Sequence, residues 1–441
     1  MSDNKPKAAT TTSASGAGKP YDPLKWHRKD TVWMLSLFGT AVGAGVLFLP
    51  IDAGGAGGIG LLFMAIISYP MAYFAHLALS RFVLSADRLD DDITDVVEQR
   101  FGFNFGMVFT ILYFIETCIT LLVYAISITN TVESFIGNQL HLPTPPRWLL
   151  SLILITALVG IASLGIDVIT KVVSALVYPV IIVLVLFSLY LIPKWNMSMV
   201  TSYPKTANGG FNVGALLENL WLLIPVMIFA FDHSAIVSSF SVAERKEYGD
   251  DEVHLKIRQI LRWGELLMVG VVMFFVISCD LSLTPGDLAL AKSQNVSILT
   301  YIANKSATPF ISWVAPIISF VAIAKSFLGN YSGTKEGLGG IIRKAASKMN
   351  RTVSKRGLMI FISCFVFLID WLVAWANPSV MDLLETMVGP IIAFILFLMP
   401  MYAIHKVPSL KKYAGRISNV FIVVVGLVGV SAIFYNIVKL F

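Results

Sequence analysis

The stretch GTAVGAGVLFLP (residues 39–50) interrupts the first long apolar segment of the chain with three closely spaced glycines, Gly39, Gly43 and Gly45. A glycine in a helix interior costs about 1 kcal/mol relative to alanine, and it permits backbone conformations that other residues avoid. Two interpretations remain open at this point. Gly39 and Gly43 form a GxxxG pair, which favours close packing of helices. Alternatively, the helix unwinds here, so that the N–H groups beginning its outer half face a negatively charged ligand group.

A second interruption lies in the sixth apolar segment, where the run FAFDHSAI (residues 229–236) follows Pro225. It places the carboxyl of Asp232 beside the imidazole of His233 and the hydroxyl of Ser234, near the middle of an otherwise apolar segment. An aspartate at the centre of a bilayer costs roughly 2.5–3.5 kcal/mol even on low insertion scales, and such residues line cavities or pair with one another. We therefore favour a functional role for Asp232 and His233. The alternative for His233 is a neutral imidazole bonded to a helix carbonyl.

The composition indicates that apolar segments of this kind make up most of the chain. Of 441 residues, 56% are hydrophobic and only 14% are charged, whereas soluble proteins average roughly 25% charged residues. Apolar runs long enough to cross a bilayer recur along nearly the whole length, separated by short polar gaps. The sequence predicts an all-α integral membrane protein with eleven transmembrane helices, at residues 31–51, 59–84, 107–136, 147–165, 168–193, 215–241, 263–284, 308–329, 357–376, 380–404 and 417–438.

The positions of the two interruptions predict how these helices are arranged. A glycine-interrupted helix opens one group of five, and a proline-containing helix with a polar centre opens the next group of five. This order is typical of a five-plus-five inverted repeat, with a ligand bound at the midplane between broken helices 1 and 6. We expect a disordered cytoplasmic tail (residues 1–30), a core of ten helices (31–404), and a cytoplasmic loop followed by one extra helix, helix 11 (405–441).

Charged residues and cysteines narrow the possible functions. Lysine and arginine fall mostly in the gaps that share a side with the N-terminal segment, so the positive-inside rule predicts a cytoplasmic N-terminus and, with eleven spans, a periplasmic C-terminus. The net charge of +6 does not indicate nucleic-acid binding, because the basic residues form no stripe or finger motif. The three cysteines lie singly in apolar runs, so we expect no disulfide, metal site, haem or other cofactor.

Six longer runs, spread in order over about residues 25–440, carry a resemblance to a known family. They are GTAVGAGVLFLP (39–50), ITNTVESF (128–135), LYLIPKWN (189–196), AERKEYGD (243–250), AIAKSFLGNYSGTKEG (322–337) and GPIIAFILFLMPMYAIHKVP (389–408). They resemble the bacterial hydroxy and aromatic amino acid permease family, in particular its serine/threonine branch, within the amino acid/polyamine/organocation superfamily. The resemblance implies an inner-membrane protein that imports L-serine by proton-coupled symport. It leaves open the import of threonine or an aromatic amino acid, and a sensor of the same shape that binds without transport.

A serine zwitterion needs donors for its carboxylate, acceptors for its ammonium and a polar contact for its hydroxyl. The N–H groups near Gly43 and Gly45 suit the carboxylate, and carbonyls released in helix 1 or in helix 6 suit the ammonium. The candidate binding residues are Thr40, Gly43, Gly45, Phe231, Asp232, Ser234 and Ser238. The alternatives are a Thr40 hydroxyl bonded to its own helix and a Phe231 ring that faces lipid or core.

The candidate residues for the coupled proton are Asp232, His233, Lys325, Ser326 and Glu116. In sodium-coupled proteins of this fold the first and eighth helices hold a sodium ion, so the resemblance implies that the ammonium of Lys325 replaces this ion. The alternative is that Lys325 extends toward the cytoplasmic surface. Glu116 departs from the family pattern and lies in the third helix, which lines the cavity in this fold. No P-loop or hydrolase motif is present, so the sequence favours a secondary transporter over an ATP-driven pump or an enzyme.

Overall fold

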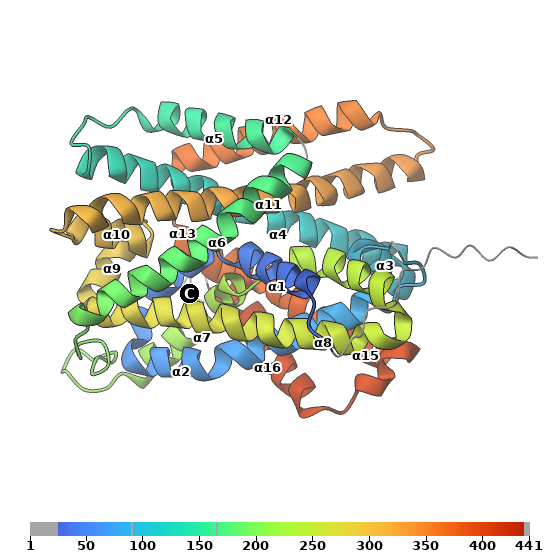
Figure 1. Ribbon diagram of the computed structural model, residues 1–441, viewed down its shortest axis with the longest axis horizontal. Helices are drawn as coiled ribbons and strands as arrows, with labels where there is room; N and C mark the ends of the chain where they lie inside the picture. The colour runs from blue at the N-terminus through green and yellow to red at the C-terminus, as the bar shows by residue number, and fades with distance from the viewer. Residues whose placement is uncertain (1–24, 90, 165, 436–441) are drawn as a thin grey trace, which may run out of the picture.

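The computed structural model describes residues 25–89, 91–164 and 166–435, without the side chains of residues 166–174. The long helices of this part of the chain run along one axis, which is horizontal in Figure 1. Short helices lie at the two ends, with α9 and α10 at the left and α3 at the right. The first 24 residues of the predicted tail lie outside the described residues.

The first predicted span consists of two helices rather than one. Helix α1 (Arg28–Ala41) ends before Val42, and α2 (Ala44–Val83) begins after Gly43. Gly43 has φ −147° and ψ −145°, which is outside the helical region, so the chain is unwound where the glycine cluster predicts it. Helix α2 itself changes direction at Gly57, where φ is +65°, and its second part corresponds to the predicted span 59–84.

The sixth predicted span is broken in the same way. Helix α7 (Val213–Ala230) ends just before Phe231, and α8 (Ser234–Ser282) begins after His233. Helix α8 continues through a non-helical residue, Gly249, into the seventh predicted span. Both helices that the sequence predicts to be broken are therefore discontinuous in the structure.

The remaining helices follow the predicted order. They are α3 (Ile93–Phe101), α4 (Phe103–Asn138), α5 (Arg147–Ser163), α6 (Ile166–Leu191), η1 (Ile192–Lys194), α9 (Pro285–Ser293), α10 (Ile298–Lys305), α11 (Pro309–Lys348), α12 (Lys355–Ala376), α13 (Val380–Leu383), η2 (Leu384–Val388), α14 (Gly389–Ile392), η3 (Ala393–Leu398), α15 (Met399–Lys406), η4 (Pro408–Tyr413), α16 (Ile417–Ser431) and η5 (Ala432–Phe434). The segments η2 and η3 are π-helical turns within the tenth predicted span.

Length and hydropathy identify nine helices able to cross a bilayer among the described residues, so the protein is an all-helical, multi-pass membrane protein. Each of the eleven predicted spans corresponds to one helix, part of one, or a broken pair. The number of such helices is lower than eleven for two reasons. Helix α2 contains both the end of the first predicted span and the whole of the second up to Val83, so these two spans count once. Helix α5 has only 17 residues and falls among the shorter apolar helices. The eleven crossings and the inverted repeat stay predictions.

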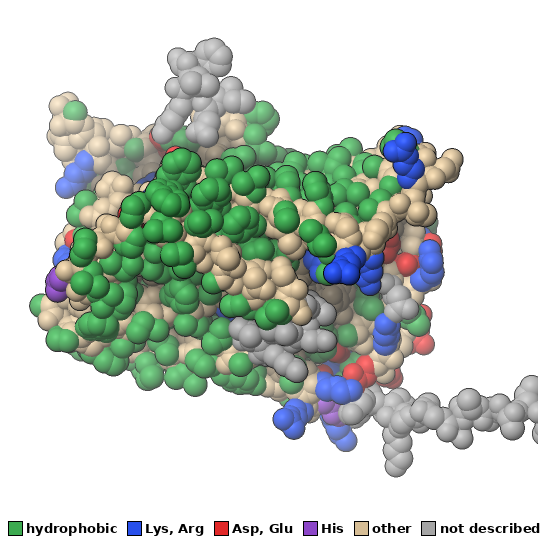
Figure 2. Space-filling model, turned by 90° about the horizontal axis from the view of Figure 1, so that it is seen from above, with side chains coloured by type: hydrophobic (Ala, Val, Ile, Leu, Met, Phe, Trp, Pro, Cys, Tyr) green, Lys and Arg blue, Asp and Glu red, His purple; other side chains and the backbone are tan. Residues whose placement is uncertain are grey.

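The helices that carry the breaks occupy the interior of the molecule. Helix α11 packs along α4, and α2 packs against both α7 and α8. In the most apolar window of α4, 67% of the residues are buried, against 28% for α12, which lies beside α5 at the edge in Figure 1. Figure 2 shows a broad hydrophobic face with charged side chains gathered at its two ends, as expected of a protein surrounded by lipid.

Helix α1 begins earlier than predicted, because residues 28–30, assigned to the disordered tail, are helical. Asp30 explains this difference. Its Oδ2 accepts the backbone N–H of His27 at 2.7 Å and lies 2.5 Å from Nζ of Lys256. Asp30 and Lys256 are both fully buried, so the described end of the chain is held against α8.

Candidate functional site

The two breaks meet in space. A Cβ atom placed on Gly45 would lie 2.9 Å from Cα of Ala230 and 2.6 Å from the ring of Phe229. Only glycine allows this approach, because any larger residue would push the first turn of α2 away from the last turn of α7. The N-terminal end of the outer half of helix 1 therefore touches the C-terminal end of the first half of helix 6.

Two further helices close around the first break. A Cβ atom on Gly43 would lie 2.7 Å from Cβ of Ser326 on α11 and 3.3 Å from the hydroxyl oxygen of Tyr124 on α4. The Tyr124 ring in turn lies 6.3 Å, centroid to centroid, from Phe229. Helices α2, α4, α7 and α11 thus converge on a small region around Gly43 and Gly45.

The start of α2 offers free hydrogen-bond donors to this region. Gly43 is the N-cap of α2, and no described side chain caps this helix. The first N–H groups of a helix have no partner within the helix, and the helix dipole adds partial positive charge at this end. The arrangement suits a carboxylate. It therefore agrees with the second interpretation of the glycine cluster, in which the helix unwinds and its N–H groups face a negatively charged ligand group.

Lys325 lies deep inside the described structure and does not reach its surface. It is only 1% exposed, and its ammonium donates to the carbonyl oxygens of Gly39 and of Val42, the latter at 2.9 Å. The hydroxyl of Ser326 donates to the same Val42 oxygen at 3.1 Å. The alternative of a surface-seeking lysine is wrong, because α11 continues for more than twenty residues beyond Lys325 instead of ending near residue 329. A cation here is favoured by the C-terminal end of α1.

Asp232 and Ser234 form a compact polar turn in the second break. Oδ1 of Asp232 accepts the N–H of Ser234 at 3.0 Å, and Oδ2 accepts the Ser234 hydroxyl at 3.1 Å. The carboxylate is thereby held at the start of α8, where a negative charge is favoured by the helix dipole. Its Oδ1 also lies 3.7 Å from Nε2 of His76 on α2.

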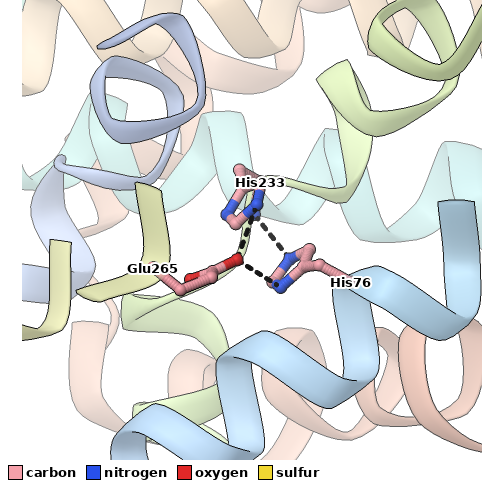
Figure 3. A group of neighbouring side chains, drawn as sticks. All are labelled: His76, His233 and Glu265. Carbon is pink, nitrogen blue, oxygen red and sulfur yellow. Dashed lines mark hydrogen bonds and ion pairs between the residues drawn. The ribbon is translucent and has the colours of Figure 1, made fainter. Parts of the chain in front are cut away.

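His233 belongs to a buried cluster with His76 and Glu265 (Figure 3). The two imidazole rings are stacked, with centroids 3.5 Å apart and planes 9° from parallel. Oε1 of Glu265 lies 3.1 Å from Nε2 of His233 and 3.4 Å from Nδ1 of His76. All three residues are only about 1% exposed.

The other predicted site residues lie around the breaks with different partners. The Thr40 hydroxyl donates to the Ser36 carbonyl of its own helix at 3.0 Å, which is the alternative given for it. Ser238 accepts the N–H of Ile93 at 3.0 Å and so joins α8 to the surface helix α3. Phe231 is buried, and Glu116 is 4% exposed and accepts the Thr120 hydroxyl at 3.2 Å. Glu116 also interacts electrostatically with Asp232.

Sequence reasoning missed His76 and Glu265. Both lie inside predicted spans, His76 well within 59–84 and Glu265 near the beginning of 263–284. The principle that titratable residues in membrane spans are costly applies to them as it does to Asp232. Their proximity to His233 could not be read from the sequence, because it depends on how α2 packs against α8.

A lysine on α9 forms ion pairs with carboxylates of α2 and η2. Nζ of Lys292 lies 2.7 Å from Oε1 of Glu385 and 3.5 Å from Oδ1 of Asp52. Burial works against the charge of Lys292, but the two carboxylates outweigh this effect and raise its pKa. The lysine thus stays charged at physiological pH and ties α9 to α2 and η2.

Comparison with known proteins agrees with the resemblance seen in the sequence. Residues 30–425 match the tryptophan/tyrosine permease family. The chain is 51% identical to a protein named serine transporter SdaC from Escherichia coli strain K12, over 97% of this chain and 99% of that protein. It is 45% identical to a threonine/serine transporter TdcC from Escherichia fergusonii, over 93% of this chain and 96% of that protein.

Proposed function

The chain belongs to the tryptophan/tyrosine permease family, and on that premise we propose that it imports L-serine together with protons across the bacterial inner membrane. The N-terminus would lie in the cytoplasm and the C-terminus in the periplasm. Residues 31–404 would form the transport core, a five-plus-five inverted repeat, and residues 405–441 would add a cytoplasmic loop and helix 11. The observation that carries the proposal is the contact between the two breaks, at Gly45 and Ala230.

The carboxylate of serine is assigned to the start of α2. The N–H groups that follow Gly43 have no partner within the helix, and this end of α2 touches the end of α7. A helix N-terminus is a favourable place for an anion because free donors and the helix dipole act together. Gly45 allows close contact between this end of α2 and the end of α7, so the proposed site lies where these two helix ends meet.

The ammonium of serine is assigned to helix 6 rather than to helix 1. The carbonyls of Gly39 and Val42 at the end of α1 already accept from Lys325. The carbonyls at the end of α7 and the carboxylate of Asp232 are the acceptors on the opposite side of the break. This choice places the ammonium beside a negative charge and leaves the ammonium of Lys325 bonded to α1.

The hydroxyl of serine is assigned to Ser234. Its own hydroxyl donates to Asp232, which leaves its oxygen free to accept a hydrogen bond from the substrate. Ser238 and Thr40 are less suited in this conformation because each is bonded elsewhere, to Ile93 and to Ser36. Phe231 would bound the pocket through its buried side chain.

The coupled proton is assigned to the ionisable and polar groups around these breaks: Asp232, His233, Lys325, Ser326 and Glu116. Lys325 supports proton coupling because its ammonium and the hydroxyl of Ser326 occupy carbonyls that would otherwise be available to a metal cation. Glu116, on α4, is a second carboxyl group that interacts electrostatically with Asp232.

Uptake of radiolabelled L-serine into proteoliposomes of the purified protein tests the proposal. With an inward proton gradient we expect serine to accumulate above its external concentration, and a protonophore to abolish the accumulation. An inward sodium gradient alone should give no accumulation. Accumulation driven only by sodium would refute proton coupling, and serine binding without any flux would favour a sensor.

A second substrate is supported by one of the relatives. The similarity to a threonine/serine transporter extends over nearly the whole chain. Threonine adds one methyl group to serine, and a single methyl group is worth only about 1–3 kcal/mol of discrimination. Unlabelled L-threonine is therefore the first competitor to include in the uptake assay, ahead of aromatic amino acids.

A further inference from the structure

The cluster of His76, His233 and Glu265 carries an inference that rests on the proposed function and makes it more specific. We propose that these three residues hold the transported proton, which is shared between Nε2 of His233 and Oε1 of Glu265, and that His76 connects this proton to Asp232. Two of the three residues lie outside the set that the sequence singled out.

The hydrogen positions follow from the carbonyl partners of the two rings. Nδ1 of His76 lies 2.8 Å from the Ala72 carbonyl, so it carries a hydrogen, while its Nε2 accepts the backbone N–H of His233 at 3.3 Å. Nδ1 of His233 lies 3.2 Å from the Phe231 carbonyl and carries a hydrogen as well. In the neutral form, Nε2 of His233 therefore carries no hydrogen.

This unprotonated nitrogen of His233 lies beside a carboxylate oxygen of Glu265. Nε2 of His233 and Oε1 of Glu265 are 3.1 Å apart, and neither has a hydrogen-bond partner among the described residues. Two acceptors at this distance in a buried place repel each other, and buried polar groups are normally satisfied. One added proton removes this repulsion, because it leaves either a carboxylic acid beside a neutral imidazole or an imidazolium beside a carboxylate.

The same three residue types also bind metal ions, but the ring geometry disfavours a metal. A metal ligated by an imidazole lies in the ring plane at about 2.0–2.1 Å from the nitrogen. The rings of His76 and His233 are nearly parallel with centroids 3.5 Å apart. An ion between their nitrogens would lie far out of both planes, so the arrangement disfavours a metal.

The surrounding charges limit the cluster to one added proton. The charges acting on His76 are those of Glu265 and Asp232, and Glu116 on α4 acts on Asp232 in turn. Tyr69 on α2 interacts electrostatically with Glu265 and with Arg262 on α8. A second proton would place positive charge on both stacked rings, 3.5 Å apart, which their mutual repulsion opposes.

One proton also favours the binding of serine. Without it, the carboxylates of Asp232 and Glu265 lie on either side of neutral imidazole rings, and both repel the carboxylate of an incoming amino acid. With it, one of the two negative charges is neutralised, and Asp232 stays available for the ammonium. His76 is a positioning residue in this account, because its Nε2 lies between the His233 N–H and the Asp232 carboxylate.

The test compares wild-type protein with Glu265→Gln, which keeps the size of the side chain but removes the acid. For the wild type, the dissociation constant of L-serine, measured on purified protein from pH 5 to 9, should rise by up to about tenfold per pH unit above the titration of the cluster. For E265Q it should change less than about twofold per unit. E265Q proteoliposomes should exchange external for internal serine but fail to accumulate it under a proton gradient.

Controls separate this inference from the proposed function. Asp370→Asn removes another carboxyl that is 1% exposed, on α12 away from the cluster, and should keep the wild-type pH slope and accumulation. His76→Gln serves as a second variant if E265Q is not recovered folded. It should also flatten the dependence of the serine dissociation constant on pH. Wild-type coupling that persists in E265Q and H76Q would overturn the inference and leave the proposed function standing, whereas a wild type without proton-driven uptake would overturn both. Stoichiometric Zn²⁺ binding lost in E265Q would overturn the proton assignment.

Discussion

Replacing Lys325 by methionine is expected to lower proton-driven serine uptake by about a hundredfold or more. Methionine has a similar length and is apolar, so the variant removes the charge with little change in packed volume. It leaves the carbonyls of Gly39 and Val42 at the end of α1 without their donor. Hydrogen bonds to a charged group are worth about 1.5–3 kcal/mol each, and a loss of about 2.7 kcal/mol already equals a hundredfold.

The matched control is Lys348→Met at the exposed end of the same helix. This variant removes the same functional group from α11 but touches neither break, so its uptake should match the wild type. Initial rates in proteoliposomes, normalised to the amount of folded protein by size-exclusion chromatography, give the comparison. Uptake by K325M within about twofold of wild type would show that the bonds from Lys325 to the first break are not needed for transport.

Replacing Lys256 by methionine should cause the largest loss of stability. Lys256 and Asp30 are both fully buried, with Nζ and Oδ2 2.5 Å apart. Removing one partner of a buried ion pair typically costs 3–5 kcal/mol because the remaining charge is left uncompensated. The melting temperature in detergent should fall by several degrees, and α1 should separate more readily from α8.

The double variant Asp30→Asn with Lys256→Met separates the unpaired charge from other effects. It removes both charges, so it should recover most of the stability lost in K256M. Thermal unfolding of wild type, both single variants and the double variant forms a complete cycle. A double variant as unstable as K256M would mean that Lys256 acts through its contact with the Lys25 carbonyl, at 2.7 Å, or through packing, and not through Asp30.

The breaks could be predicted from the sequence because their causes are local. Three glycines within seven residues weaken a helix wherever it packs, and an Asp-His pair in an apolar segment requires polar surroundings. The sequence therefore predicts discontinuous helices 1 and 6, and the structure has them at Gly43 and at Phe231–His233. The depth of Lys325 depended on where its helix ends, and the hydropathy pattern placed that end too early.

The composition of the buried cluster could not be predicted, because it depends on packing between distant segments. His76 meets Glu265 only because α2 and α8 lie side by side, and nothing in either segment specifies the register of this contact. The pairing of Asp30 with Lys256 is of the same kind. A composition low in apolar residues made the beginning of the chain resemble a disordered tail, although residues 28–30 are helical.

A structure of the protein with L-serine bound tests the central claim most directly, that the substrate lies where the two breaks meet. We predict serine density with its carboxylate within about 2.7–3.2 Å of the N–H groups that follow Gly43, and with its ammonium toward Asp232. Serine bound instead in the polar pocket of about 640 Å³ that is lined in part by Asn130, Glu133 and Arg147 would contradict the account.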